Sequence, residues 1–331
     1  MTMIIQPVKA ALISLLQSPT LPFENGGVVD ATRILDCHCT LGECILYDDL
    51  RNSVVWTDID GKQFHSLHLD SGDHKVIDLP KILGAFALRK EGEPGILCAW
   101  EDGFQFYDVD TGKALGDMSV GEEVNPKGLP TRLNDGRVDP SGKKFICGGF
   151  YGDVEGNYMK VFRVEVPENN EASGLIHEPI IEEVQVTNSI CFSPSGKTMY
   201  FADSPTRTIC KFDYEQGVLS NKQTVKVYDV GVPDGSCTDS NGNIWNAVWR
   251  NGAGPSMVLC INPNTCEIIH TVRMPDETSQ VTCCCFGGPD LDILFISTAH
   301  INRDRSKEPD AGSVYAVKLG VKGCAEKRFC A

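Results

Sequence analysis

The sequence predicts an all-β fold, a six-bladed β-propeller with a divalent-metal site at its centre. A strong β-run recurs six times with starts 41 to 54 residues apart, a period typical of four-stranded propeller blades. Turn motifs return at the same place in successive repeats, and helical periodicity is nearly absent. The six β-runs are Val54–Ile59, Gly95–Trp100, Lys144–Gly149, Thr198–Asp203, Asn243–Val248 and Ile293–Ser297.

Turn chemistry supports the repeat. Three of the runs follow the turns Asp139-Pro-Ser-Gly142, Ser193-Pro-Ser-Gly196 and Asp239-Ser-Asn-Gly242, which open with Asp or Ser and close with Gly. A further strand that ends near an aspartate follows several runs, and we expect it to be the third strand of a blade. These third strands are His65–Leu69, Phe104–Tyr107 and Thr208–Phe212.

The propeller is expected to cover residues 33–319. Gly312–Lys318 would be the third strand of the sixth blade, and Arg33–Cys37 would supply the outer strand that closes the ring, because closure removes exposed sheet edges. We expect residues 1–32 to be an N-terminal extension, either poorly ordered or a short helix, and residues 320–331 to be a C-terminal tail.

Composition limits the partners and the compartment. Asp and Glu outnumber Lys and Arg by 45 to 30, and the resulting net charge of −15 argues against nucleic acid or an anionic membrane as a partner. The 15 cysteines include no C-x-x-C pair, and Cys283-Cys284-Cys285 falls in an apparent buried strand, where free Cys acts as a small hydrophobe. We therefore expect a cytoplasmic protein, as a monomer or weak dimer.

Four polar residues occupy the same position of their repeats, here called the slot. Glu43, Asn134, Asn188 and Asp234 each lie five residues before a turn residue. Asn and Asp favour turns and strand entrances on their own, but four of six repeats in register favour a shared site on the propeller axis. The other two slot residues, Gly84 and Thr282, carry no charge and are expected to leave room for a substrate.

Carboxylate and amide oxygens are the ligands of Ca²⁺, Mg²⁺ and Mn²⁺, whereas zinc normally attracts His or Cys. The slot holds neither, and we expect His65 and His68 to be solvated on a surface strand. The run Cys37-His-Cys39 with Cys44 is similar to half of a zinc knuckle. No second ligand pair follows at a suitable spacing, so the sequence favours a structural or incidental role for these residues over a zinc site.

Five segments together have a recognisable order. They are Leu41-Gly-Glu-Cys44, Arg132-Leu-Asn-Asp-Gly136 with Val138-Asp-Pro-Ser-Gly142, Asn188 with Phe192-Ser-Pro-Ser-Gly196-Lys-Thr-Met-Tyr-Phe-Ala-Asp-Ser-Pro-Thr206, Pro233-Asp-Gly235, and Phe286-Gly-Gly-Pro-Asp-Leu-Asp292. In these segments the chain resembles the gluconolactonase, regucalcin and luciferin-regenerating-enzyme family over residues 34–319. Members of that family are six-bladed propellers that hold one divalent cation in the central channel.

The resemblance implies roles for the four polar slot residues and for Arg132. Glu43, Asn188 and Asp234 correspond to the metal ligands, and Asp234 also to the general base. Arg132 and Asn134 correspond to the substrate-binding pair, with Asn134 also close to the metal through water. Because residues i and i+2 of a strand face the same way, both side chains of that pair would point into the channel.

The sequence departs from the family pattern near these motifs. Cys44 stands where Gly or Ser is usual, and Ser189 stands where Gly is usual. Asp153 lies where some members place a glutamate that faces the substrate, which makes it a further substrate-binding candidate. These departures bear on the identity of the substrate more than on that of the metal.

The resemblance and the residues together predict a metal-dependent hydrolase that opens a sugar lactone to its aldonic acid. The cation would act as Lewis acid and Asp234 as general base. Ca²⁺ is the preferred cation, with Zn²⁺, Mn²⁺ or Mg²⁺ as alternatives. Neither a G-x-S-x-G nucleophile motif nor a dinucleotide-binding motif occurs.

Three other functions remain open at the level of sequence. The first is a Ca²⁺-binding regulatory protein without significant turnover, for which the pair Arg132 and Asn134 would be unnecessary. The second keeps metal-dependent hydrolysis but changes the substrate to another ester or an organophosphate. The third is a protein-interaction propeller, in which the metal site would be dispensable.

Overall fold

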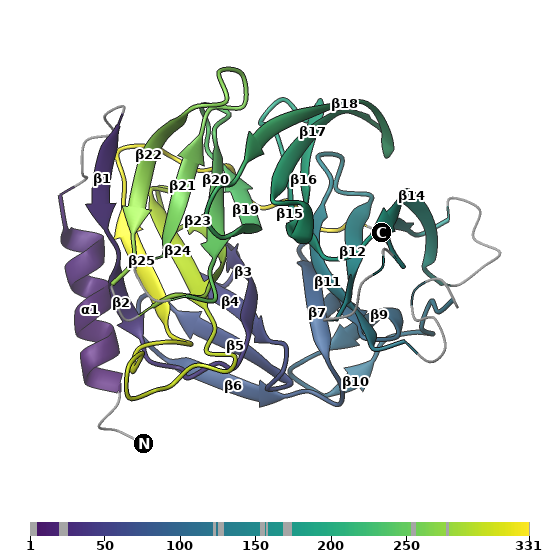
Figure 1. Cartoon of the computed structure of the whole chain (residues 1–331). Helices are drawn as coiled ribbons and strands as arrows, with labels where there is room; N and C mark the ends of the chain where they lie inside the picture. Colours follow the sequence, from purple (N-terminus) through teal and green to yellow (C-terminus); the bar gives the residue numbers. More distant parts are fainter. Residues whose placement is uncertain are drawn as a thin grey trace. The chain divides into compact units, whose positions relative to one another are not determined.

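The structure of the protein is a computed structural model. It describes residues 5–330 except 20–25, 122–123, 125–128, 153–155, 157, 168–173, 253–255 and 276–277. The chain forms two compact units, which we describe separately: unit 1 is Met1–Val76 with Tyr228–Glu326, and unit 2 is Ile77–Val227 with Lys327–Ala331. The fold is all-β and has the six blades of a β-propeller, as the sequence predicts (Figure 1).

Unit 1 contains blades one, five and six, in which antiparallel strands follow one another in chain order. Blade one is β3 (Gly42–Asp48), β4 (Ser53–Asp58), β5 (Gln63–His68) and β6 (His74–Asp78), the last of which extends past the unit boundary. Blade five is β19 (Val232–Thr238), β20 (Ile244–Trp249), β21 (Met257–Ile261) and β22 (Ile268–Arg273). Blade six is β23 (Val281–Gly287), β24 (Ile293–Thr298) and β25 (Val314–Lys318), with β2 (Thr32–Leu35) as its outer strand.

Unit 2 contains blades two, three and four in the same arrangement. Blade two is β7 (Leu83–Leu88), β8 (Ile96–Trp100), β9 (Gly103–Asp108) and β10 (Lys113–Ala114). Blade three is β11 (Thr131–Val138), β12 (Phe145–Tyr151), β13 (Met159–Glu165) and β14 (Ile176–Val184). Blade four is β15 (Thr187–Phe192), β16 (Thr198–Asp203), β17 (Thr208–Glu215) and β18 (Val218–Val227), and a 3₁₀ turn, η1 (Ser204–Thr206), follows β16. The six strong β-runs of the sequence are the second strands of these blades.

The N-terminal part of the chain adds one strand to each of the last two blades. β2 pairs antiparallel with β25, which confirms that the segment near Arg33 supplies the outer strand of blade six. β1 (Gly27–Asp30) pairs parallel with β22 and adds a fifth strand to blade five. The segment expected to be an extension also contains helix α1 (Ile5–Gln17), which runs beside β2 and β25 in Figure 1. Its residues Val8 and Leu12 lie one helical turn apart and are buried there.

The core of unit 1 lies between neighbouring blades, and β23 shows how it is divided. Cys283 and Cys285 face the cluster built by blade one and α1, whereas Cys284 faces the cluster of blade five. This alternation follows from the two-residue period of a strand that is covered on both faces. The three consecutive cysteines are therefore buried apolar side chains, as expected, and the structure contains them as free thiols.

Asp239 is the centre of the turn between β19 and β20. It is fully buried, its Oδ1 accepts the backbone N–H groups of Asn241 and Asn243, and its Oδ2 accepts the Asn243 amide and the Trp245 indole N–H, all at 2.9 Å. One carboxylate thus satisfies four donors inside the protein, which explains why the turn opens with Asp.

Replacing Asp239 with Ala should destabilise the protein by about 3 kcal/mol, because the buried indole and amide donors lose their acceptor. The measurement is urea unfolding followed by tryptophan fluorescence. Asp110→Ala, at an exposed turn position, is the matched control and should change stability by less than about 0.5 kcal/mol. Equal effects of both substitutions would contradict the role assigned to Asp239.

Candidate functional site

All slot residues lie at irregularities of the first strand of their blades. The pairing register with the second strand shifts at the slot in every blade, as in a β-bulge, which changes the direction of a side chain without ending the strand. The shifts lie between Glu43 and Leu46, Leu83 and Ala85, Leu133 and Gly136, Asn188 and Cys191, Pro233 and Ser236, and Val281 and Cys283.

Unit 1 brings two carboxylates to its first strands. Glu43 is on β3 and Asp234 is on β19, and β23 lies between these two strands as a neighbour of each. The side chains are 8% and 5% exposed, respectively, so both carboxylates are buried with a small accessible area. Glu43 Oε2 accepts the N–H of Cys44 at 3.1 Å. Unit 1 therefore contains the two acidic residues of the slot.

Asn246 fixes the bulge that carries Asp234. Its amide Nδ2 donates to the backbone carbonyl of Asp234 at 2.8 Å and to Ser236 Oγ at 2.9 Å. Its Oδ1 in turn accepts the Tyr228 hydroxyl at 2.6 Å. These contacts hold the bulge through the Asp234 backbone carbonyl.

Unit 2 brings Arg132, Asn134 and Asn188 into one hydrogen-bonded chain. An Arg132 guanidinium N–H donates to Asn134 Oδ1, and Asn134 Nδ2 donates to Asn188 Oδ1 at 3.2 Å. Asn188 Nδ2 donates to Ser204 Oγ at 2.8 Å, which directs its amide oxygen toward Asn134. The guanidinium also lies over the Phe150 ring, 4.3 Å from its centroid. Arg132 and Asn134 therefore lie side by side, and that both point into the channel stays a prediction.

Two aspartates fix the entrances of slot strands. The Asp58 carboxylate accepts the backbone N–H of Leu41 at 2.9 Å, and the Asp203 carboxylate accepts that of Val186 at 2.8 Å. Each acceptor lies 15 residues after the slot residue of its blade, Glu43 or Asn188, a spacing that sequence reasoning missed. Burial raises the pKa of Asp203, and the backbone hydrogen bonds partly offset this.

The departures from Gly beside the slot have a conformational cost. Cys44 and Ser189 both have left-handed backbone conformations, with φ of 49° and 59°. Glycine adopts this region without the clash of a Cβ atom, which explains why it is usual there. Both residues lie inside the bulges that hold Glu43 and Asn188.

The two uncharged slot positions each have a packing role, and the room they would leave for a substrate stays a prediction. A Cβ atom on Gly84 would lie 2.1 Å from the Leu133 carbonyl oxygen, so glycine is needed for the close approach of β7 and β11. The Thr282 hydroxyl donates to the Gly42 carbonyl and contacts Ser297 Oγ at 2.9 Å. Both residues serve packing between neighbouring blades. Asp153 lies outside the described residues.

The prediction that His65 is solvated was wrong. Its side chain is buried, stacks on Trp56 with centroids 5.0 Å apart, and contacts His74 Nε2 through Nδ1 at 3.1 Å. The residue pattern of β5 alone does not show this, because the covering groups come from other segments. Burial lowers the pKa of His74 to about 4, so that ring is neutral at physiological pH.

The candidate site residues of unit 1 and those of unit 2 differ in chemistry. Glu43 and Asp234 are negative oxygen donors, which suit a hard cation, while Asn134 and Asn188 are neutral amides and Arg132 carries a positive charge. The six slot residues include neither His nor Cys. No helix in the described part of the chain is both long and apolar enough to cross a membrane.

Comparison with known proteins agrees with the motifs. The family model described as the SMP-30/gluconolactonase/LRE-like region matches residues 41–300. The chain is 32% identical to regucalcin of Danio rerio over 86% of this chain and 92% of that protein. It is 30% identical to 6-deoxy-6-sulfogluconolactonase of Pseudomonas putida over 87% and 94%, respectively.

A solved structure of the calcium-binding protein regucalcin from Agrobacterium tumefaciens is also similar. It superimposes with a TM-score of 0.78 at 27% identity, covering 92% of this chain and 99% of that one. The family model covers well over half of the present chain, in the region that contains all six slot residues. The chain belongs to the SMP-30/gluconolactonase/LRE-like family.

Proposed function

We propose that this protein is a divalent-metal-dependent lactonase that opens a sugar lactone to the aldonic acid. The observation that carries the proposal is the hydrogen-bonded chain from Arg132 through Asn134 to Asn188. It couples a cationic substrate-binding group to one of the residues proposed to hold the metal. The similarity to a protein named as a sulfogluconolactonase supports a sugar lactone as substrate.

The proposed metal ligands are Glu43, Asn188 and Asp234. Two carboxylates and one amide oxygen fit Ca²⁺, with Mg²⁺, Mn²⁺ and Zn²⁺ as alternatives to be compared by experiment. When bound, such a cation polarises the lactone carbonyl and lowers the pKa of a coordinated water. The Asn188 amide is suited to ligation because Ser204 holds its nitrogen, and its oxygen, which accepts from Asn134, has a second lone pair for a cation.

The chain's own residues supply the remaining chemistry. The Asp234 carboxylate is assigned the proton of the attacking water, the role that the resemblance to the family implies for it. The Arg132 guanidinium has further N–H donors for sugar hydroxyls or for the oxygen that gains negative charge. Asn134 positions Arg132, because its own oxygen accepts from that guanidinium. Asp153 remains a proposed substrate contact.

A second candidate is a Ca²⁺-binding regulatory protein without turnover. The similarity to proteins named regucalcin, one of them described as calcium-binding, favours it. Calcium binding alone gives no role to the arginine that Phe150 and Asn134 hold in place. The two candidates therefore differ in the need for Arg132.

A panel of aldonolactones tests the proposal, with proton release followed by a pH indicator. Removal of divalent cations by chelation should lower the hydrolysis rate by about 10²-fold, and Ca²⁺ should restore it, since carbonyl polarisation by the cation is lost and regained. Replacement by Mg²⁺, Mn²⁺ and Zn²⁺ identifies the preferred ion. Calcium binding without turnover on any lactone or ester would contradict the lactonase and support the regulatory protein.

A further inference from the structure

A second group of metal-binding side chains lies outside the slot, in unit 1. One sulfur of Cys39, one carboxylate oxygen of Asp58 and one ring nitrogen of His65 all lie within 4.8 Å of one another, and all three residues are buried. They come from the loop before β3, the end of β4 and the middle of β5. Only the cysteines could be singled out from the sequence, because His65 and Asp58 join them through the fold.

A second sulfur extends the group. Cys39 Sγ lies 3.5 Å from Cys37 Sγ and 3.9 Å from His65 Nε2. A tetrahedral zinc ion with ligands at about 2.3 Å (sulfur) and about 2.0 Å (nitrogen) separates two sulfurs by about 3.8 Å and sulfur from nitrogen by about 3.5 Å. The Cys37–Cys39 and Cys39–His65 spacings are therefore within about half an ångström of those that one shared ion requires. Cys37 lies outside the group whose ligand atoms are within 4.8 Å of one another, so its thiol would turn toward the ion on binding.

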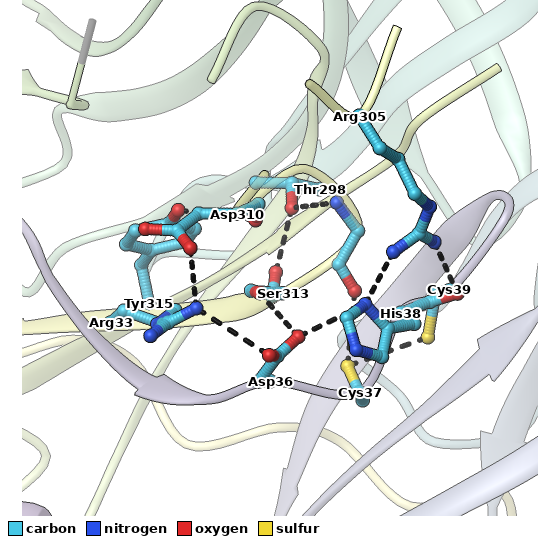
Figure 2. A network of polar contacts seen from close by, with 11 residues as sticks. Arg33, Asp36, Cys37, His38, Cys39, Thr298, Arg305, Asp310, Ser313 and Tyr315 are labelled. Atoms are coloured by element: carbon cyan, nitrogen blue, oxygen red, sulfur yellow. Dashed lines mark hydrogen bonds and ion pairs between the residues drawn. The ribbon is translucent and has the colours of Figure 1, made fainter. Parts of the chain in front are cut away.

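The segment that carries the two sulfurs is fixed by a polar network (Figure 2). Asp36, directly before Cys37, forms an ion pair with Arg33 at 3.5 Å and accepts the Ser313 hydroxyl at 3.4 Å. The Asp58 carboxylate accepts the Thr40 N–H at 2.8 Å on the other side of Cys39. Both ends of the short segment are thus held, and the two side chains need little ordering to bind an ion.

Hydrogen bonds and ring stacking hold the side chains of this group, as they commonly hold the ligands of a metal ion. His65 Nδ1 lies 3.1 Å from His74 Nε2, an arrangement that orients the ring so that Nε2 faces the Cys39 sulfur. The Trp56 indole N–H donates to Cys39 Sγ at 3.4 Å, as indole donors do to metal-bound sulfur. Trp56 also stacks on both imidazoles and excludes water from them.

We propose that Cys37, Cys39 and His65, with Asp58 as the fourth ligand, form a structural site for a thiophilic ion, Zn²⁺ in the first place. With both thiols protonated, Cys39 donates to Cys37 and Cys37 donates to the Gly312 carbonyl. Binding replaces these two protons by the ion and releases them to solvent. The ion would tie the loop before β3 to β4 and β5.

This site is separate from the proposed slot cation in both ligands and ion class. Sulfur and imidazole select zinc or copper(I), whereas the slot offers only oxygen. The loop that contains Cys39 leads directly into β3 and Glu43, so the structural ion would fix the entrance of that slot strand. The proposal does not depend on lactonase activity.

Cobalt(II) substitution tests it in the full-length, reduced protein. With excess Ca²⁺ present, one equivalent of Co²⁺ should give the near-ultraviolet charge-transfer absorption of a cobalt–thiolate bond, and Zn²⁺ should abolish it. Zn²⁺ should also raise the midpoint of thermal unfolding by about 4 °C, since the folded chain binds it more tightly than the unfolded chain does. A wild-type protein without cobalt–thiolate absorption overturns the proposal.

The variants assign the ligands. Cys37→Ser, at a half-buried position, should abolish the absorption and the shift while circular dichroism stays unchanged, and Cys39→Ser should do the same if it folds. Cys266→Ser, at an exposed cysteine, should retain both. Glu43→Gln removes a proposed slot ligand and should also retain them, which separates this site from the lactonase proposal. Absorption that survives in Cys37→Ser, or is lost in Glu43→Gln, contradicts the site.

Discussion

Replacing Asp234 with Asn should lower kcat/KM for lactone hydrolysis by about 10³-fold, because a positioned general base contributes roughly 10²–10⁴-fold. The amide has the size of the carboxylate but neither accepts the water proton nor offers a negative ligand. The fold should persist, since Asn246 holds the bulge through the backbone carbonyl of Asp234. The measurement is the indicator assay at saturating Ca²⁺, together with calorimetric titration of Ca²⁺.

Asp229→Asn is the matched control for this experiment. It makes the same chemical change five residues upstream, on an exposed side chain. It should leave kcat/KM and Ca²⁺ affinity unchanged. An Asp234→Asn protein with normal Ca²⁺ affinity and the full hydrolytic rate would contradict both roles proposed for Asp234.

Replacing Arg132 with Met should lower kcat/KM by about 10²-fold while Ca²⁺ affinity stays close to that of the wild type. The loss of one donor to a developing oxyanion costs about 10²–10³-fold in kcat. Met keeps an apolar stem over the Phe150 ring but removes the guanidinium that Asn134 and Phe150 position. Arg132→Lys should recover only part of the activity, because its ammonium lacks the planar donor geometry.

This variant tests the need for the guanidinium. A regulatory calcium site would not use it, so reduced hydrolysis at unchanged Ca²⁺ affinity supports the lactonase, whereas unchanged kinetics would contradict the role proposed for Arg132. Arg51→Met, at an arginine whose side chain is 59% exposed, is the control for nonspecific loss of positive charge. It should behave as the wild type in both measurements.

The blades could be predicted from the sequence because their signals are local. A turn such as Asp239-Ser-Asn-Gly242 and the β-run after it lie within a dozen residues, and the slot is found by counting back from the turn. No local sequence motif indicates the bulges at the slot. They arise where the first strand of a blade meets the second, and the alternation of apolar residues does not record them.

Other features depend on contacts between distant segments, which explains the error at His65. His65 has the pattern of a half-exposed strand, but the loop of Cys39 and the ring of His74 cover it. The sequence also does not show that the Leu133 carbonyl fills the space a side chain on Gly84 would take. The hydrogen bond between Asn134 and Asn188 likewise joins residues 54 positions apart.

The pairing of β2 with β25 sets the order in which the protein can be completed during synthesis. Blades two, three and four come from one continuous stretch of chain, so their strands can pair soon after they leave the ribosome. β2 is made among the first strands, yet its partner is the last strand of all. Until then β2 has an unpaired edge, a feature that favours aggregation. Blade six is therefore completed only once β25 has been synthesised.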